Sequence, residues 1–137
     1  MRFSISPGKQ LRYFRTLRGM TQKQLGMAIG FSEQTADVRI AQYESGVRIP
    51  KEKTVAALAD ALAVSPAALS IPQIEDEAVL MRLLFSLEDE YGIVLSTPCD
   101  IPDTRLGKAL SDWRQLSEKQ KNGEITKEEY DEWRFSF

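Results

Sequence analysis

A short stretch in the first third of the chain carries side chains that can hydrogen-bond to the edges of nucleic-acid bases. They are Gln34, Thr35, Arg39 and Gln42. A glutamine amide can bond adenine in a bidentate manner and an arginine guanidinium can bond guanine, and each such pair discriminates between bases by about 1–3 kcal/mol. Arg39 could also hold a phosphate or pair with another charge in solvent. These residue types permit base recognition if a helix presents them to a groove.

Start and stop signals for helices recur through residues 1–70. Starts are predicted at Ser6-Pro7, at the capping box of Thr21 and Gln24, at Ser32, at Pro50 and at Ser65-Pro66. Apolar residues follow at helical spacing, and the expected core positions are Leu11, Phe14, Leu17, Leu25, Ala28, Ile29, Ala36, Ile40, Tyr43, Val55, Leu58, Ala59 and Leu62. The pattern predicts a compact domain of five helices, the first over about 7–18.

The rest of the chain predicts a linker at 71–74 and a small, mostly helical C-terminal region over 75–137. A helix over about 75–91 is expected to bury Leu80, Leu84, Leu87 and Tyr91, and residues 93–95 could form a short strand. Asp103 is the expected cap of a second helix, which buries Leu106, Leu110, Trp113 and Leu116 and ends at Asn122-Gly123. A capping box of Thr126 and Glu129 opens a last helix.

Charge is divided unevenly along the chain. Residues 1–53 carry ten cations and four anions, a net of +6, whereas residues 54–137 carry eight cations and sixteen anions, a net of −8. A basic half joined to an acidic half is typical of a nucleic-acid-facing domain with a partner domain. Ordinary charge scatter is the alternative, because charge balance alone says little about partners.

The composition argues against several classes of protein. The chain has no histidine, and its one cysteine is Cys99, so a zinc site, an internal disulfide and histidine-based catalysis are not expected. Asp100 and Asp103 are interpreted as surface charge or capping groups. No apolar run could span a membrane and no signal peptide is recognisable. We therefore expect a cytoplasmic protein that is not an enzyme and has no cofactor or metal.

Two capped helices separated only by Gly30-Phe31 have the geometry of a helix-turn-helix, which places its second helix in the major groove. Three segments occur in a characteristic order: RTLRGMTQKQLG at 15–26, YESG at 43–46 and LADALAVSP at 58–66. Together they resemble the Cro/repressor-type (Xre-like) helix-turn-helix family over about residues 8–70. The resemblance implies a repressor-like fold and double-stranded DNA as the partner. It further implies a sequence-specific transcriptional regulator, a repressor or autoregulator of bacterial or phage origin.

The resemblance also suggests roles for individual residues. Gln22, at the start of the second helix, is expected to contact a phosphate, and the loop carrying Arg48 and Lys51 to clamp the DNA backbone. Arg15 and Glu44 are expected to form a structural ion pair. Glu33 could accept from cytosine, but stabilisation of the third helix's N-terminus is favoured. The full set of expected DNA-binding residues is Gln22, Lys23, Ser32, Gln34, Thr35, Arg39, Gln42, Arg48 and Lys51.

The chain departs from the family in one place. Tyr43 follows Gly30 by thirteen positions, about four more than is usual for the family. Four residues are close to one helical turn of about 3.6, so the insertion is predicted to lengthen the third helix without rotating its buried face. Gln34 and Thr35 match base-reading positions when counted from the turn, and Gln42 does when counted back from Glu44.

The C-terminal region is rich in aromatic residues for its length: Trp113, Tyr130, Trp133, Phe135 and Phe137. They could form a small core or a surface for self-association, because aromatic residues concentrate at interfaces. Two linked DNA-binding domains bind DNA with higher affinity than one. We therefore predict a homodimer through residues 75–137. The alternative is an antitoxin-like or phage inhibitor protein, whose acidic C-terminal region binds a protein partner.

Overall fold

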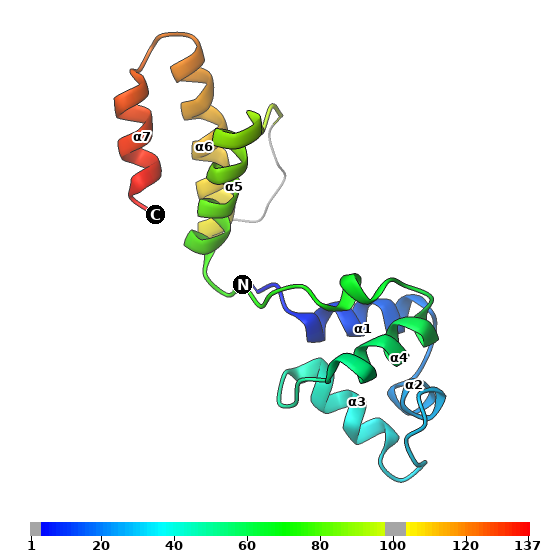
Figure 1. The fold of residues 1–137 in the computed structure, drawn as a ribbon. Coiled ribbons are helices and arrows are strands. Elements are labelled where there is room, and N and C mark those ends of the chain that lie inside the picture. Colours follow the sequence, from blue (N-terminus) through cyan, green and yellow to red (C-terminus); the bar gives the residue numbers. More distant parts are fainter. Residues whose placement is uncertain (1–3, 98–103) are drawn as a thin grey trace. The chain divides into compact units, whose positions relative to one another are not determined.

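The computed structural model describes residues 4–97 and 104–137, which divide into two compact units. We call residues 5–73 the N-terminal unit and residues 74–137, with which Ser4 is grouped, the C-terminal unit (Figure 1). Cys99, and also Asp100 and Asp103, which the sequence predicts to be surface charges or capping groups, lie outside the described residues. Within the described residues every regular element is a helix, which confirms the predicted mainly helical fold.

The N-terminal unit contains four α-helices and one short 3₁₀ helix. They are α1 (Pro7–Leu17), α2 (Gln22–Ala28), α3 (Ala36–Ser45), α4 (Glu52–Leu62) and η1 (Pro66–Leu69). The last element is the short fifth helix that the sequence predicted after Ser65-Pro66, and it is a 3₁₀ helix. Ser65 precedes it, but its side chain makes no capping hydrogen bond.

Two predicted helix caps are formed as expected. The hydroxyl of Ser6 accepts from the backbone N–H of Lys9 at 3.2 Å, ahead of α1. At α2 the backbone N–H of Gln24 donates to Thr21 Oγ1 at 3.0 Å, and the N–H of Thr21 donates to Gln24 Oε1 at 2.8 Å. These bonds satisfy backbone donors that a helix leaves free at its first turn.

One hydrophobic cluster joins the helices of the N-terminal unit. Its buried members are Leu11, Leu25, Ile40, Tyr43, Leu58, Ala59, Leu62 and Leu69, with Ala36 also fully buried. Leu17 and Ala28 are exposed, in contrast to the prediction. Leu17 follows Leu11 by six residues, which places the two side chains about 120° apart around α1. Leu17 therefore lies outside the buried side of the helix.

The C-terminal unit is built from three α-helices. They are α5 (Glu77–Tyr91), α6 (Arg105–Lys121) and α7 (Lys127–Phe135), and α6 contacts both of the others. The buried core is formed by Met81, Phe85, Ala109, Leu110, Trp113 and Tyr130. Thr104 caps α6 by accepting from the N–H of Gly107 at 3.0 Å, at the position next to the predicted Asp103. The Thr126–Glu129 capping box and the end of α6 at Asn122-Gly123 are as predicted.

Two predictions for the C-terminal unit are wrong. The buried residues of α5 are Met81 and Phe85, while Leu87 and Tyr91 are exposed. No strand forms at residues 93–95 in the described structure; instead Val94 and Leu95 pack against the core. The aromatic residues are shared between core and surface, because Trp113 and Tyr130 are buried within this unit whereas Phe135 is exposed.

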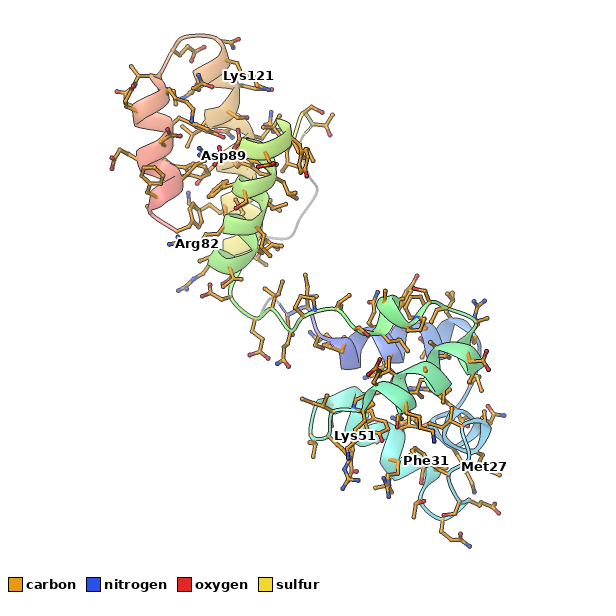
Figure 2. All side chains as sticks on the ribbon, viewed as in Figure 1. Met27, Phe31, Lys51, Arg82, Asp89 and Lys121 are labelled. Carbon is orange, nitrogen blue, oxygen red and sulfur yellow. The ribbon has the colours of Figure 1, made fainter. Side chains whose placement is uncertain are left out.

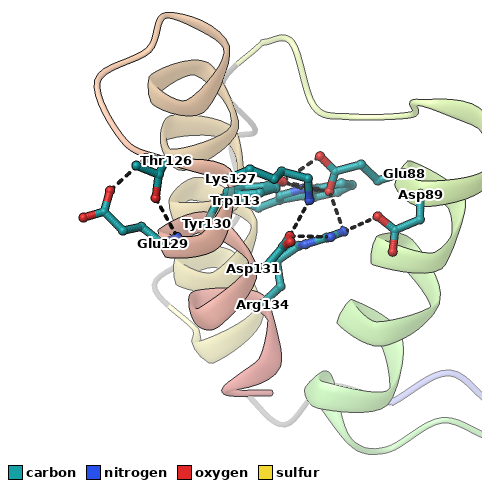
Figure 3. A network of polar contacts seen from close by, with 9 residues as sticks. All are labelled: Glu88, Asp89, Trp113, Thr126, Lys127, Glu129, Tyr130, Asp131 and Arg134. Atoms are coloured by element: carbon teal, nitrogen blue, oxygen red, sulfur yellow. Dashed lines mark hydrogen bonds and ion pairs between the residues drawn. The ribbon is translucent and has the colours of Figure 1, made fainter.

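A polar network connects the three helices of the C-terminal unit around Glu88 (Figure 3). Its carboxylate accepts from Trp113 Nε1 at 3.0 Å and from the Tyr130 hydroxyl at 2.6 and 2.7 Å. The buried guanidinium of Arg134 donates to Glu88 at 3.4 Å, to Asp89 at 2.8 Å and to Asp131 at 2.8 Å. Burial, followed by the hydrogen bond to Glu88, raises the pKa of Tyr130 well above its usual value. The phenol therefore stays protonated as a donor.

Candidate nucleic-acid interface

Helix α3 has one buried side and one side that faces solvent. Ala36, Ile40 and Tyr43 are buried at spacings of four and three residues, as predicted. Arg39 and Gln42 flank this buried side and are partly exposed. Val38 projects from the opposite side with 54% of its surface exposed. The unit thus holds α3 by one side and leaves polar and apolar groups accessible on the other.

The four extra residues do not lengthen α3, so the prediction of a longer third helix is wrong. The connection between α2 and α3 runs from residue 29 to 35, and α3 has ten residues beginning at Ala36. Ser32 to Thr35 form a turn, in which the N–H of Thr35 donates to the carbonyl of Ser32 at 3.1 Å. The hydroxyls of Ser32 and Thr35 also lie 2.9 Å apart. The connection between the helices is therefore longer than the tight Gly30-Phe31 turn that the sequence predicted.

Several of the expected DNA-binding residues therefore lie outside α3. Ser32 and Gln34 are exposed in the connection, and Thr35 occupies the position immediately before α3 without making a side-chain capping bond. Ser32 is therefore not the cap of α3. Arg39 and Gln42 remain as the expected DNA-binding residues that lie on α3 itself.

Glu33 also has a different environment from the one predicted. It lies in the connection, three residues before α3 begins, and its carboxylate pairs with Lys23 Nζ at 3.0 Å on the surface. The acidic residue in the first turn of α3 is Asp37. The favourable interaction with the helix N-terminus therefore belongs to Asp37 and not to Glu33.

Phe31 positions Arg39. The guanidinium carbon of Arg39 lies 5.3 Å from the centre of the Phe31 ring, within the range of a cation–π contact. The same ring packs near Tyr43 in the core, with the two centroids 6.4 Å apart. Sequence reasoning missed this role because Phe31 and Arg39 belong to different elements, and their spacing carries no helical signal.

The expected ion pair between Arg15 and Glu44 is present and includes a third residue. Arg15 Nε and Nη2 both donate to the Glu44 carboxylate, the latter at 3.2 Å, and Arg15 Nη1 donates to the carbonyl of Met20 at 2.8 Å. The amide of Gln22 donates to Glu44 Oε2 at 2.9 Å. The two charged side chains are only 11% and 6% exposed. This cluster links α1, the start of α2 and the end of α3, and the Gln22 amide carries a second hydrogen besides the one it donates to Glu44.

The loop between α3 and α4 carries exposed cations. Arg48 and Lys51 are exposed, and Lys51 is labelled beside Phe31 and Met27 of the same unit in Figure 2. The N–H of Arg48 donates to the carbonyl of Gln42 at 3.2 Å, which anchors the loop to the last turns of α3. Val47 and Ile49 on either side of Arg48 are also largely exposed. The loop presents positive charge next to the exposed side of α3.

The crossing of α2 and α3 depends on Gly26. A Cβ atom added there would lie 2.6 Å from the carbonyl oxygen of Ala36 and 2.8 Å from its Cα. Both are backbone atoms, so the two helices would have to move apart. The sequence pattern singled out the glycines at helix ends, whereas Gly26 lies inside a helix and was missed.

We expect Gly26→Ala to destabilise the N-terminal unit by about 1–3 kcal/mol, the usual cost of overpacking, although alanine favours helix formation. Urea unfolding followed by circular dichroism would measure the change. Met27→Ala, on the exposed side of the same helix, is the control and should leave stability nearly unchanged. Equal stability of the two variants would contradict the close crossing.

Neither a metal-binding cluster nor a membrane-spanning helix is present in the described residues. No group of three or more histidine, cysteine, aspartate or glutamate side chains in residues 4–97 and 104–137 could hold a metal ion. Every helix in the same residues is too short or too polar to span a bilayer.

A family model described as helix-turn-helix matches residues 11–69. Among solved structures, the crystal structure of the transcriptional regulator BswR is 31% identical, with a TM-score of 0.46; the match covers 61% of this chain and 96% of that one. No curated protein shows significant similarity to the chain.

Proposed function

Residues 11–69 belong to the Cro/C1-type helix-turn-helix family, and from this premise we propose that the protein is a sequence-specific transcriptional regulator that represses by occupying an operator. The observation that carries the proposal is α3, which is buried on one side and presents Arg39, Gln42 and Val38 on its accessible surface. Family members insert this helix in the major groove. Regulation of its own gene is the simplest version of the proposal.

The exposed groups of α3 match the chemistry of base edges. Arg39 can donate to the two acceptors of guanine, Gln42 can bond adenine, and Val38 can contact a thymine methyl group. The stacking of Arg39 on Phe31 restricts the guanidinium before DNA is bound. Restricting a long side chain in advance lowers the entropy cost of forming the complex.

The remaining cations fit contacts with the DNA backbone. Arg48 and Lys51 lie in the loop that follows α3, and Lys23 lies in the first turn of α2. Residues 5–73 carry nine cations and five anions. Contacts of cations with phosphates supply affinity without sequence information and weaken as salt rises.

The direct test is a fluorescence-anisotropy titration of the full chain with the duplex upstream of its own gene and with a scrambled duplex, over a salt series. Binding that prefers the native duplex and weakens steeply with salt would support the proposal. Equal binding to both duplexes at every salt concentration would contradict autoregulation through this sequence.

Two alanine variants should separate base reading from backbone contact. Gln42→Ala is expected to lower the preference for the native over the scrambled duplex by about tenfold, with an unchanged salt slope. Arg48→Ala is expected to weaken binding to both duplexes and to reduce the salt slope by about one. The same anisotropy titrations measure both effects. Identical behaviour of the two variants would contradict this division of roles.

We further propose that the regulator acts as a homodimer through the C-terminal unit, because two reading heads on adjacent half-sites add affinity and specificity. The unit has a hydrophobic core and a polar network of its own. Its acidic character also supports the second candidate, a protein partner bound through residues 75–137. Co-purification of a stoichiometric second protein would favour that candidate.

A further inference from the structure

Helix α5 has a second apolar row in addition to the one that faces its core. Val79, Leu83, Leu87 and Tyr91 recur every four residues, and they are 46%, 50%, 40% and 71% exposed. Steps of four residues advance by about 40° around a helix, so the four side chains form one continuous row. Exposed single leucines are ordinary, but a contiguous apolar row on one helix marks an interaction surface.

A row of polar residues runs beside the apolar row on the same helix. It consists of Arg82, Ser86 and Glu90, again four residues apart. Arg82 and Glu90 are exposed, and neither side chain forms an ion pair in the described part of the chain. Arg82 lies on α5 in Figure 2. The row has a positive end, a small centre and a negative end.

We propose that α5 packs antiparallel against α5 of a second copy of this chain. When two identical helices pair about a twofold axis perpendicular to them, each row meets the same row of its partner in reverse order. Arg82 then faces Glu90 of the second copy, Glu90 faces Arg82, and Ser86 faces Ser86. In the apolar row, Leu83 faces Leu87. A helix rises by about 1.5 Å per residue. One position of the twofold axis therefore brings the facing residues of both rows to within about 1.5 Å of the same height along the helices.

The charges select this arrangement over the parallel one. In a parallel pair Arg82 would face Arg82 and Glu90 would face Glu90, and both contacts would be repulsive. In the antiparallel pair the two ion pairs lie along one edge of a buried apolar row. The inference rests on the proposed homodimer and names the surface that would form it.

Sedimentation velocity of the full chain without DNA, over a concentration series, tests the proposal. The wild-type protein should dimerise reversibly. Leu83→Glu should raise the dissociation constant of the dimer by at least about tenfold, because a charge replaces a buried leucine in each copy. Phe135→Glu is the matched control, since Phe135 is also an exposed apolar residue, at 68%, but lies on α7; this variant should dimerise like the wild type. Unchanged circular dichroism would show that the variants fold.

Charge reversal tests the orientation. Arg82→Glu and Glu90→Arg should each raise the dissociation constant by about tenfold, because each dimer contains the pair twice. The double variant should return it to within about threefold of the wild type, because the two charges are exchanged but still complementary.

Three outcomes would overturn the proposal: a wild-type chain that stays monomeric, a dimer insensitive to Leu83→Glu, or single reversals that the double variant does not rescue. A monomer that still preferred its native duplex would leave the proposed regulatory function standing, so the two failures are distinguishable.

Discussion

Replacing Glu88 with alanine is expected to lower the free energy of unfolding of the C-terminal unit by about 3–5 kcal/mol. Its carboxylate accepts from Trp113 and Tyr130, which are 1% and 2% exposed, and it pairs with Arg134. Hydrogen bonds to a charged group contribute about 1.5–3 kcal/mol each. Removal of the Glu88 carboxylate leaves the buried hydroxyl of Tyr130 without an acceptor and takes one charge partner from the buried guanidinium of Arg134, whereas Trp113 Nε1 keeps a bond to the Tyr130 oxygen at 3.1 Å. The buried Nε of Arg134 has no hydrogen-bond partner among the described residues.

Tryptophan fluorescence during urea unfolding would measure this effect selectively, because Trp113 and Trp133 both lie in the C-terminal unit. Glu132→Ala removes an exposed glutamate of α7 and is the control, with an expected change within about 0.5 kcal/mol. If Glu88→Ala and Glu132→Ala shifted the fluorescence midpoint equally, the network would not stabilise the unit. The free energy of unfolding of Glu88→Gln should lie between those of Glu88→Ala and Glu132→Ala, because the amide keeps one acceptor oxygen.

A second large effect is expected at the other end of the chain, where Glu44→Ala should destabilise the N-terminal unit by about 3–5 kcal/mol. The substitution leaves the largely buried guanidinium of Arg15 without its charge partner and Gln22 without its acceptor. Breaking a buried ion pair by removing one member costs far more than the pair itself contributes. Because the N-terminal unit contains no tryptophan, the loss should be visible in circular dichroism and absent from tryptophan fluorescence.

The matched control is Glu33→Ala, which removes the acidic member of the exposed Lys23–Glu33 pair. Surface pairs contribute at most about 1 kcal/mol, so this variant should remain close to the wild type. Similar stability losses in the two variants would contradict a stabilising role for the Arg15–Glu44 cluster. Arg15→Ala in the Glu44→Ala background should cost little more, since the unpaired charge has then been removed.

The sequence predicted those features whose physical causes are local. The caps at Ser6, Thr21 and Thr126 follow from side chains that reach a backbone N–H within three residues. Most of the N-terminal core follows from helical spacing, and the Arg15–Glu44 contact came from the resemblance to a family. The mainly helical fold was therefore predictable without any knowledge of long-range contacts.

The errors arose where long-range contacts decide the structure. The sequence of α5 offers two apolar rows, one through Met81 and Phe85 and another through Leu83 and Leu87, and spacing alone does not tell which one is buried. Glu88 lies on the buried side because its partners belong to α6 and α7, and these cannot be known from α5. Gly26 and Phe31 were missed for the same reason, since their importance lies in contacts with α3.

The turn from Ser32 to Thr35 separates the length of the connection between α2 and α3 from the orientation of α3. The carbonyl of Ser32 accepts from the N–H of Thr35 within the turn and from the N–H of Ala36 at the start of α3, while the crossing at Gly26 and Ala36 fixes where α3 begins. Chain length in this segment can therefore vary without rotating α3 relative to α2. Insertions and deletions here offer a route by which related regulators can diversify the surface ahead of the helix, while the helix itself keeps its orientation.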